Sequence, residues 1–143
     1  MANFDAAFNK VIKFEGGYVN DKDDRGGETY LGIARNFHGK STMWKYVDEA
    51  KAANPGVSNS KLTSILKKDT RIDDEVKRIY KHLYWDKVKG DELVSQKIAE
   101  QLFDMGVNAG IVTAIKLMQK TLNLTQTGKV DDNFVKLLNE KAN

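Results

Sequence analysis

Glu15 is the residue of this sequence whose position most suggests chemistry. Five apolar residues recur at the spacing of one helix face: Phe4, Ala7, Phe8, Val11 and Ile12. At about 100° per residue, Glu15 returns to within about 20° of Phe4 and so onto this apolar face. A carboxyl group held there loses hydration, which raises its pKa and keeps it protonated near neutral pH. A protonated carboxyl group is what a general acid requires.

Two other interpretations of Glu15 stay open at this point. The side chain reaches solvent from a frayed last turn, or it forms a structural ion pair with Arg25 or Arg35. The residues that follow favour chemistry, because two glycines permit close approach and the next loop supplies Asp21, Asp23, Asp24 and Thr29. A second carboxylate facing the first would complete the arrangement that hydrolyses a glycosidic bond.

The elements that must position these residues are mostly helical. The first helix is expected to end near Glu15, before Gly16-Gly17. Residues 20–32 are rich in Asn, Asp and Gly and end in a short apolar run, which predicts a loop or small β-hairpin. Apolar periodicity and capping residues predict further helices at 43–53, 61–68, 73–85, from Ser95 to about 109, at 111–122 and after Asp131 or Asp132. The fold class predicted is α+β, predominantly α.

Composition excludes several classes of protein. The 143 residues are 41% apolar and 30% charged, which is typical of one globular domain, and no apolar run is long enough for a membrane span. The chain has no cysteine and only two histidines, so no disulfide scaffold, thiol nucleophile, thiolate metal site or zinc motif is expected. Glycosidic hydrolysis by carboxyl groups needs no metal or organic cofactor, and none is expected. The net charge is +3, and the basic residues are spread along the chain. Because they form no basic stretch, nucleic acid is not an expected partner.

Several segments, in order along the chain, carry a resemblance to a known family. They are Phe14-Glu15-Gly16-Gly17-Tyr18-Val19-Asn20-Asp21, Asp24 to Ile33, Tyr84-Trp85-Asp86, and Phe103 to Gly110 with its Asp-x-x-x-Asn-x-Gly pattern. This pattern resembles glycoside hydrolase family 108, a family of bacterial and phage muramidases that includes endolysins. Residues 114–139 resemble that family's C-terminal predicted peptidoglycan-binding segment.

The resemblance implies a lysozyme-like fold with a small N-terminal hairpin region. It also implies hydrolysis of the β-1,4 bond between N-acetylmuramic acid and N-acetylglucosamine, with Glu15 as the catalytic acid. Family members often have proline where this chain has Lys22 and Arg25, which leaves the geometry of the loop that holds Asp24 open.

A looser analogy to the lysozymes of tailed phages assigns two further catalytic residues. Their pattern places an Asp nine residues after the acid and a Thr some six further on, which Asp24 and Thr29 nearly reproduce. Asp24 is then the second carboxylate and Thr29 a hydroxyl that positions water, with Asp21 as the rival carboxylate. Asp24 is equally typical of a turn and Thr29 of a strand. Action through water would require carboxyl groups about 6.5 to 9.5 Å apart and would invert the anomeric configuration.

Sugar rings present apolar faces and hydroxyl edges, so a glycan cleft combines aromatic platforms with amide and carboxylate groups. The aromatic candidates are Tyr18, Tyr30 and Trp85, and each is equally typical of a packed core. Tyr18 and Asn108 lie inside matched motifs and are assigned here to substrate binding. Asn108 is alternatively a residue that caps the end of a helix.

The sequence thus predicts a lysozyme-like catalytic domain at 1–109 and a helical segment at 110–143 packed on the same core. We expect a monomer that binds peptidoglycan and does not insert into membranes. No secretory signal is recognised, so the protein is expected to be made in the cytoplasm and to reach the cell wall through a holin, a secretion apparatus or lysis. A lytic transglycosylase and a non-catalytic wall-binding protein are the alternative functions.

Overall fold

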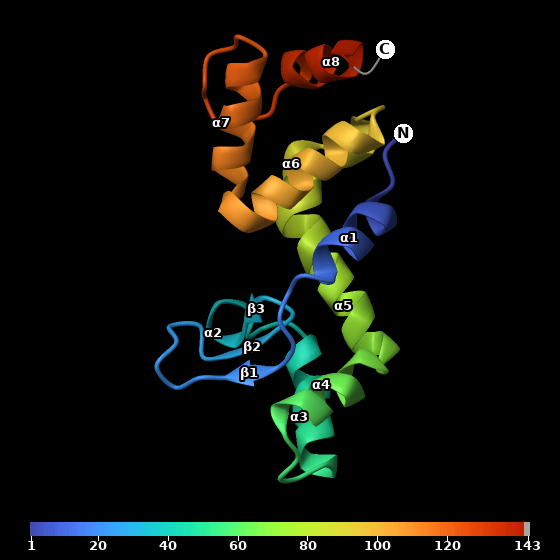
Figure 1. Cartoon of the computed structure of the whole chain (residues 1–143), viewed down its shortest axis with the longest axis vertical. Coiled ribbons are helices and arrows are strands. Elements are labelled where there is room, and N and C mark those ends of the chain that lie inside the picture. The colour runs from blue at the N-terminus through green and yellow to red at the C-terminus, as the bar shows by residue number, and fades with distance from the viewer. Residues whose placement is uncertain (142–143) are drawn as a thin grey trace. The chain divides into compact units, whose positions relative to one another are not determined.

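The computed structural model describes residues 1–141 of the chain (Figure 1). They form two compact units: Met1–Val11 together with the chain from Tyr80 onward, and Ile12–Ile79. The predicted division into a catalytic domain at 1–109 and a C-terminal segment at 110–143 stays a prediction. In the structure, the helices beyond residue 110 belong to the first unit. Within residues 1–141, no helix has both the length and the apolar character needed to cross a membrane.

The first unit is helical and its core is aromatic. Its elements are α1 (Phe4–Ile12, whose last residue falls in the second unit), η1 (Lys81–Trp85), η2 (Asp86–Val88), η3 (Gly90–Glu92), α6 (Gln96–Ala109), α7 (Ile111–Thr121) and α8 (Asp132–Lys141). The ring of Phe4 lies 5.6 Å from the rings of both Trp85 and Phe103, edge to face. This geometry suits the charge distribution of aromatic rings. The Trp85 indole also donates a 2.8 Å hydrogen bond to Asp91, so its polar edge is paired.

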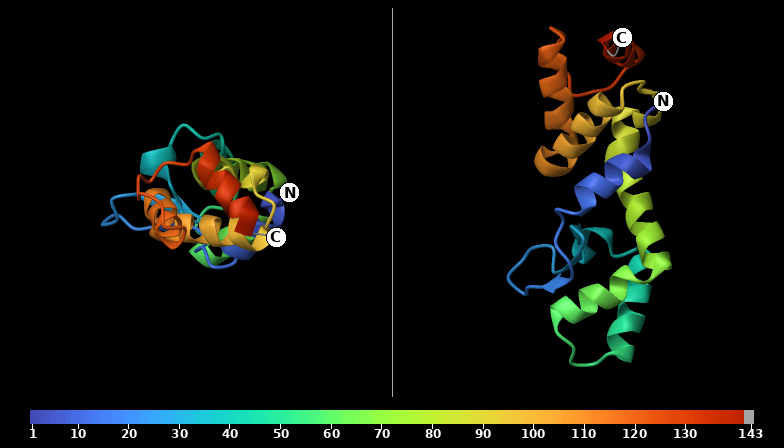
Figure 2. Two further views of the ribbon diagram at one scale, coloured as in Figure 1. Left: turned by 90° about the horizontal axis from the view of Figure 1, so that it is seen from above. Right: turned by 45° about the vertical axis from the view of Figure 1, so that its right-hand side comes forward.

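Short-range signals begin and end the last three helices. The Ser95 hydroxyl accepts a hydrogen bond from the Ile98 N–H at the start of α6, as predicted. Gly110 has a φ of +97°, which favours glycine, and it joins α6 to α7, which packs against α6 (Figures 1 and 2). Asp131 accepts a hydrogen bond from the Phe134 N–H and begins α8.

The second unit combines a small sheet with helices. Its elements are β1 (Val19–Asn20), β2 (Glu28–Tyr30), β3 (Ile33–Ala34), α2 (Arg35–His38), α3 (Met43–Ala53), α4 (Asn59–Lys67) and α5 (Thr70–Tyr80, whose last residue falls in the first unit). The strands are antiparallel in the order β1-β2-β3, and Thr29 pairs with Val19 on one side and Ala34 on the other. The predicted hairpin region is therefore a three-stranded sheet.

Two predicted helix boundaries are wrong. The first helix ends at Ile12 rather than near Glu15. The helix predicted to begin at Asp73 begins at Thr70, because the Asp69 carboxylate accepts a hydrogen bond from the Arg71 N–H one turn earlier. Its continuation from Lys81 is a π-helical turn.

Candidate active site

Glu15 lies in residues 13–18, which join α1 to β1. Its N–H still donates to the Ile12 carbonyl oxygen at 3.2 Å, but the helix does not continue. Further along the segment, at Gly17, a Cβ would come within 2.5 Å of the Thr63 hydroxyl oxygen. A side chain at this position would therefore collide with α4, and glycine permits the close approach. Because α1 ends at Ile12, Glu15 does not lie on a helix face as the apolar periodicity predicted, although its partial burial was predicted correctly.

The Glu15 carboxyl group is half-buried and unpaired. No group within residues 1–141 forms a hydrogen bond or ion pair with it. The alternative of an ion pair with Arg35 is wrong, because the Arg35 guanidinium binds Glu28 and Asp48 instead. Burial raises the pKa of Glu15. A carboxyl group with this combination of burial and missing counterion is held toward its protonated form, as a general acid must be.

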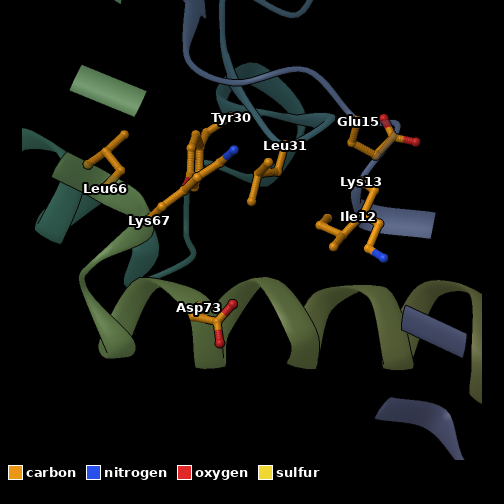
Figure 3. A pocket seen from close by; sticks show the side chains of 8 residues that line it. All are labelled: Ile12, Lys13, Glu15, Tyr30, Leu31, Leu66, Lys67 and Asp73. Carbon is orange, nitrogen blue, oxygen red and sulfur yellow. The ribbon is translucent and has the colours of Figure 1, made fainter. Parts of the chain in front are cut away.

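A pocket of about 320 Å³ lies between the Glu15 segment, β2, α4 and α5. Figure 3 shows Glu15 at its edge with the carboxyl group directed away from Asp73 on α5. Asp73 is therefore not a carboxylate that faces the acid. The pKa of Tyr30 is raised to about 12, first by burial and second by the negative charge of Asp73.

Asp24 and Thr29 both lie close to Gly26. A Cβ on Gly26 would lie 3.6 Å from a carboxylate oxygen of Asp24 and 3.7 Å from the methyl group of Thr29. The same Asp24 oxygen accepts a 3.0 Å hydrogen bond from the Gly26 N–H, so it stabilises the turn while its residue stays exposed. Asp21 makes the equivalent contact with the Asp23 N–H. No group of three acidic or histidine side chains within residues 1–141 is arranged to hold a metal ion.

Tyr18 is buried and its hydroxyl is engaged. The ring is 5% exposed, and its hydroxyl donates a 2.7 Å hydrogen bond to Glu28. Glu28 also accepts from Lys51 at 2.9 Å and from Arg35 at 3.1 Å, and Arg35 holds Asp48 through both terminal nitrogens. Burial alone would raise the pKa of Glu28, but the Tyr18 and Lys51 hydrogen bonds and the two cations lower it. These contacts do not favour glycan binding by Tyr18. Its assignment to substrate binding stays a prediction from the sequence.

Asn108 lies in the last turn of α6, in the first unit, whereas Glu15 lies in the second. Its side-chain amide donates to the Asp104 backbone oxygen at 2.9 Å and to the Asp104 carboxylate at 3.1 Å. Both residues are exposed. Its assignment to substrate binding stays a prediction, while the local contact with the helix end is an observed feature.

Phe14 is an exposed aromatic residue next to Glu15 that the sequence did not single out. The three aromatic candidates, Tyr18, Tyr30 and Trp85, are 5%, 1% and 0% exposed. Phe14 directly precedes Glu15 and is 88% exposed. The spacing of apolar residues carried no signal for it, because it falls beyond the end of α1, where periodicity no longer applies.

Comparisons with known proteins identify a family and a similar fold. The family described as Glycosyl hydrolase 108 matches residues 8–110, which include Glu15, Asp24 and Asn108. Among solved structures, the chain is similar to one titled "Structure of Brucella abortus SagA", with 26% identity and a TM-score of 0.60. That match covers 96% of this chain and 68% of the other. No curated protein matched the chain.

The matched residues make up more than half of the chain and contain the Glu15 segment, the sheet and helices α2 to α6. The predicted α+β, predominantly helical and lysozyme-like fold is confirmed. The family supports peptidoglycan hydrolysis of the lysozyme type in general terms. The chain belongs to glycosyl hydrolase family 108.

Proposed function

We propose that this protein is an N-acetylmuramidase that cleaves the β-1,4 bond between N-acetylmuramic acid and N-acetylglucosamine in peptidoglycan, with Glu15 as the general acid. The observation that carries the proposal is the half-buried, unpaired Glu15 carboxyl group, whose pKa burial raises. This acid lies inside the residues that match a glycosidase family. Protonation of the glycosidic oxygen by such a group is the step that glycoside hydrolysis needs.

Asp24 is the proposed second carboxylate and Thr29 the proposed water-positioning hydroxyl. Their common neighbour Gly26 supports a joint role, because both side chains lie within 3.7 Å of the position that a Cβ would take there. Asp24 accepts the Gly26 N–H through one carboxylate oxygen, which fixes the direction of the group and leaves its second oxygen for water. The hydrogen bond that stabilises the turn would in this way also orient Asp24 toward water.

Phe14 is a proposed platform for the apolar face of a sugar ring next to the acid. Phe14→Ala is expected to raise KM about fivefold and to leave kcat within a factor of two, since stacking of this kind contributes roughly 1 kcal/mol. The measurement is steady-state kinetics on soluble glycan strands. Phe37→Ala is the matched control, because Phe37 is 68% exposed but lies in α2. Equal effects of the two substitutions would contradict the platform role.

A lytic transglycosylase is the second candidate, and the exposed position of Asp24 favours it. Such an enzyme uses one acid and the 6-hydroxyl of the substrate, so it needs no second carboxylate. In the structure Asp24 is exposed and already serves the turn, whereas Glu15 alone combines burial with the absence of a partner among the catalytic candidates of residues 1–141.

The released sugar ends distinguish the two reactions. Purified peptidoglycan is incubated with the protein, reduced with borohydride and analysed by mass spectrometry. Reducible N-acetylmuramic acid ends are expected, and 1,6-anhydro ends would instead identify a transglycosylase. Binding without release of either end would indicate a wall-binding protein. Action at the cell wall is part of this proposal.

A further inference from the structure

The chain segment that carries Glu15 is anchored on both sides. On its N-terminal side, Val11 is buried in α1 and Ile12 accepts the Glu15 N–H. On its C-terminal side, the Tyr18 N–H donates to the Thr63 hydroxyl of α4 at 2.9 Å, and the Thr63 hydroxyl in turn donates to the Asn59 carbonyl oxygen. Glu15 lies three residues from each anchor, so these anchors limit where its carboxyl group can lie.

The side chain of Tyr18 extends the second anchor to α3. Its hydroxyl donates to Glu28, and the Lys51 ammonium group of α3 lies 5.6 Å from the centre of its ring. Lys51 also bonds the same Glu28 oxygen. Glu28 is the first residue of β2, so one carboxylate joins the Glu15 segment, the sheet and α3. Its side chain is only 15% exposed, so water competes little for these bonds.

From these contacts we infer that Tyr18 and Glu28 are positioning residues that hold Glu15 in its catalytic place, and that Tyr18 does not contact the glycan. The inference rests on the proposed function, in which Glu15 is the general acid. The Tyr18 ring is buried and its hydroxyl already has an acceptor, so neither is available to a sugar. Loss of the hydroxyl would remove the link from this segment to Glu28 and so loosen it, while the buried ring would keep its packing.

The test uses two anchor variants: Tyr18→Phe removes the bond to Glu28, and Thr63→Val removes both bonds of the Thr63 hydroxyl. The control is Tyr46→Phe, which makes the same chemical change as Tyr18→Phe on α3 at a residue outside the anchor. A misplaced acid lowers the rate of chemistry more than substrate binding. We expect kcat on soluble glycan strands to fall between about 5-fold and 100-fold in both anchor variants, with KM unchanged. Tyr46→Phe is expected to change neither.

A second measurement does not depend on activity. Carbon-13 NMR titration of the Glu15 carboxyl group should show its raised pKa moving down toward the ordinary value in both anchor variants, because a freed segment is better hydrated. A rise in KM with kcat unchanged, or a Glu15 titration identical to that of the wild type, would overturn the inference. If the wild type releases no sugar ends, the proposed function fails, and the titration still decides whether Tyr18 positions Glu15.

Discussion

Glu15→Gln is expected to reduce peptidoglycan hydrolysis by about 100-fold to 10,000-fold while binding to peptidoglycan is retained. Glutamine has nearly the same shape but has no proton to give to the leaving oxygen. Folding should not suffer, because the carboxyl group has no hydrogen bond or ion pair within residues 1–141 and its charged form is disfavoured by burial. Release of reducing ends, cosedimentation with sacculi and thermal unfolding measure the three effects.

The matched control for this substitution is Glu49→Gln in the same compact unit. The Glu49 side chain is 51% exposed and forms a long ion pair of 3.5 Å with Arg71. Glu49→Gln should hydrolyse peptidoglycan at the wild-type rate. Residual activity of Glu15→Gln within tenfold of the wild type would show that another group protonates the leaving oxygen.

The pH profile gives an independent check on the same residue. The acid must be protonated, so kcat/KM should fall as pH rises through the pKa of Glu15. Burial raises that pKa above 4.5, and the decline should therefore begin at higher pH than for an exposed glutamate. A decline centred at 4.5 would mean that the Glu15 carboxyl group is fully hydrated in the working enzyme.

Glu28→Ala is expected to lower the free energy of unfolding by about 3 kcal/mol at pH 7. The substitution removes the acceptor of three hydrogen bonds, from Tyr18, Lys51 and Arg35, and leaves two cations without that partner. Glu28→Gln keeps the shape but loses the charge and should cost about 2 kcal/mol. Denaturant unfolding followed by circular dichroism measures both, with Glu49→Gln as the exposed control, expected to change the value by less than about 0.5 kcal/mol.

The effect of Glu28 should depend on pH in a defined direction. Its partners lower the pKa of Glu28 in the folded protein below the ordinary 4.5. The ionised group therefore stabilises the fold fully above the unfolded-state pKa, and this contribution is lost as pH falls through the folded-state pKa. The stability difference between the wild type and Glu28→Gln should accordingly shrink in acid. A difference that stays constant from pH 7 to below the folded-state pKa would show that the ion pairs do not stabilise the protein.

The sequence alone predicted most of the helices, because the signals that start and stop them are local. Ser95 caps α6 through a group three residues away, and Gly110 takes a backbone angle that few other residues adopt. The early start of α5 depended on a contact of Asp69 with Arg71, which apolar periodicity does not report. The end of α1 was predicted about three residues too late, because the Gly16-Gly17 stop signal lies beyond the last helical residue, Ile12.

The candidate site divides in the same way. The sequence determined that an acid with two following glycines precedes an Asp-rich turn and a short strand, and these residue types already indicated glycosidic chemistry. Only the tertiary structure decided that Glu15 is unpaired and that Arg35 turns to Glu28 and Asp48 instead. It also decided that the Tyr18 hydroxyl is engaged and that Phe14 is exposed. The physical reason is distance along the chain: Tyr18 and Thr63 are 45 residues apart, and contacts at that separation follow from packing, not from local propensity.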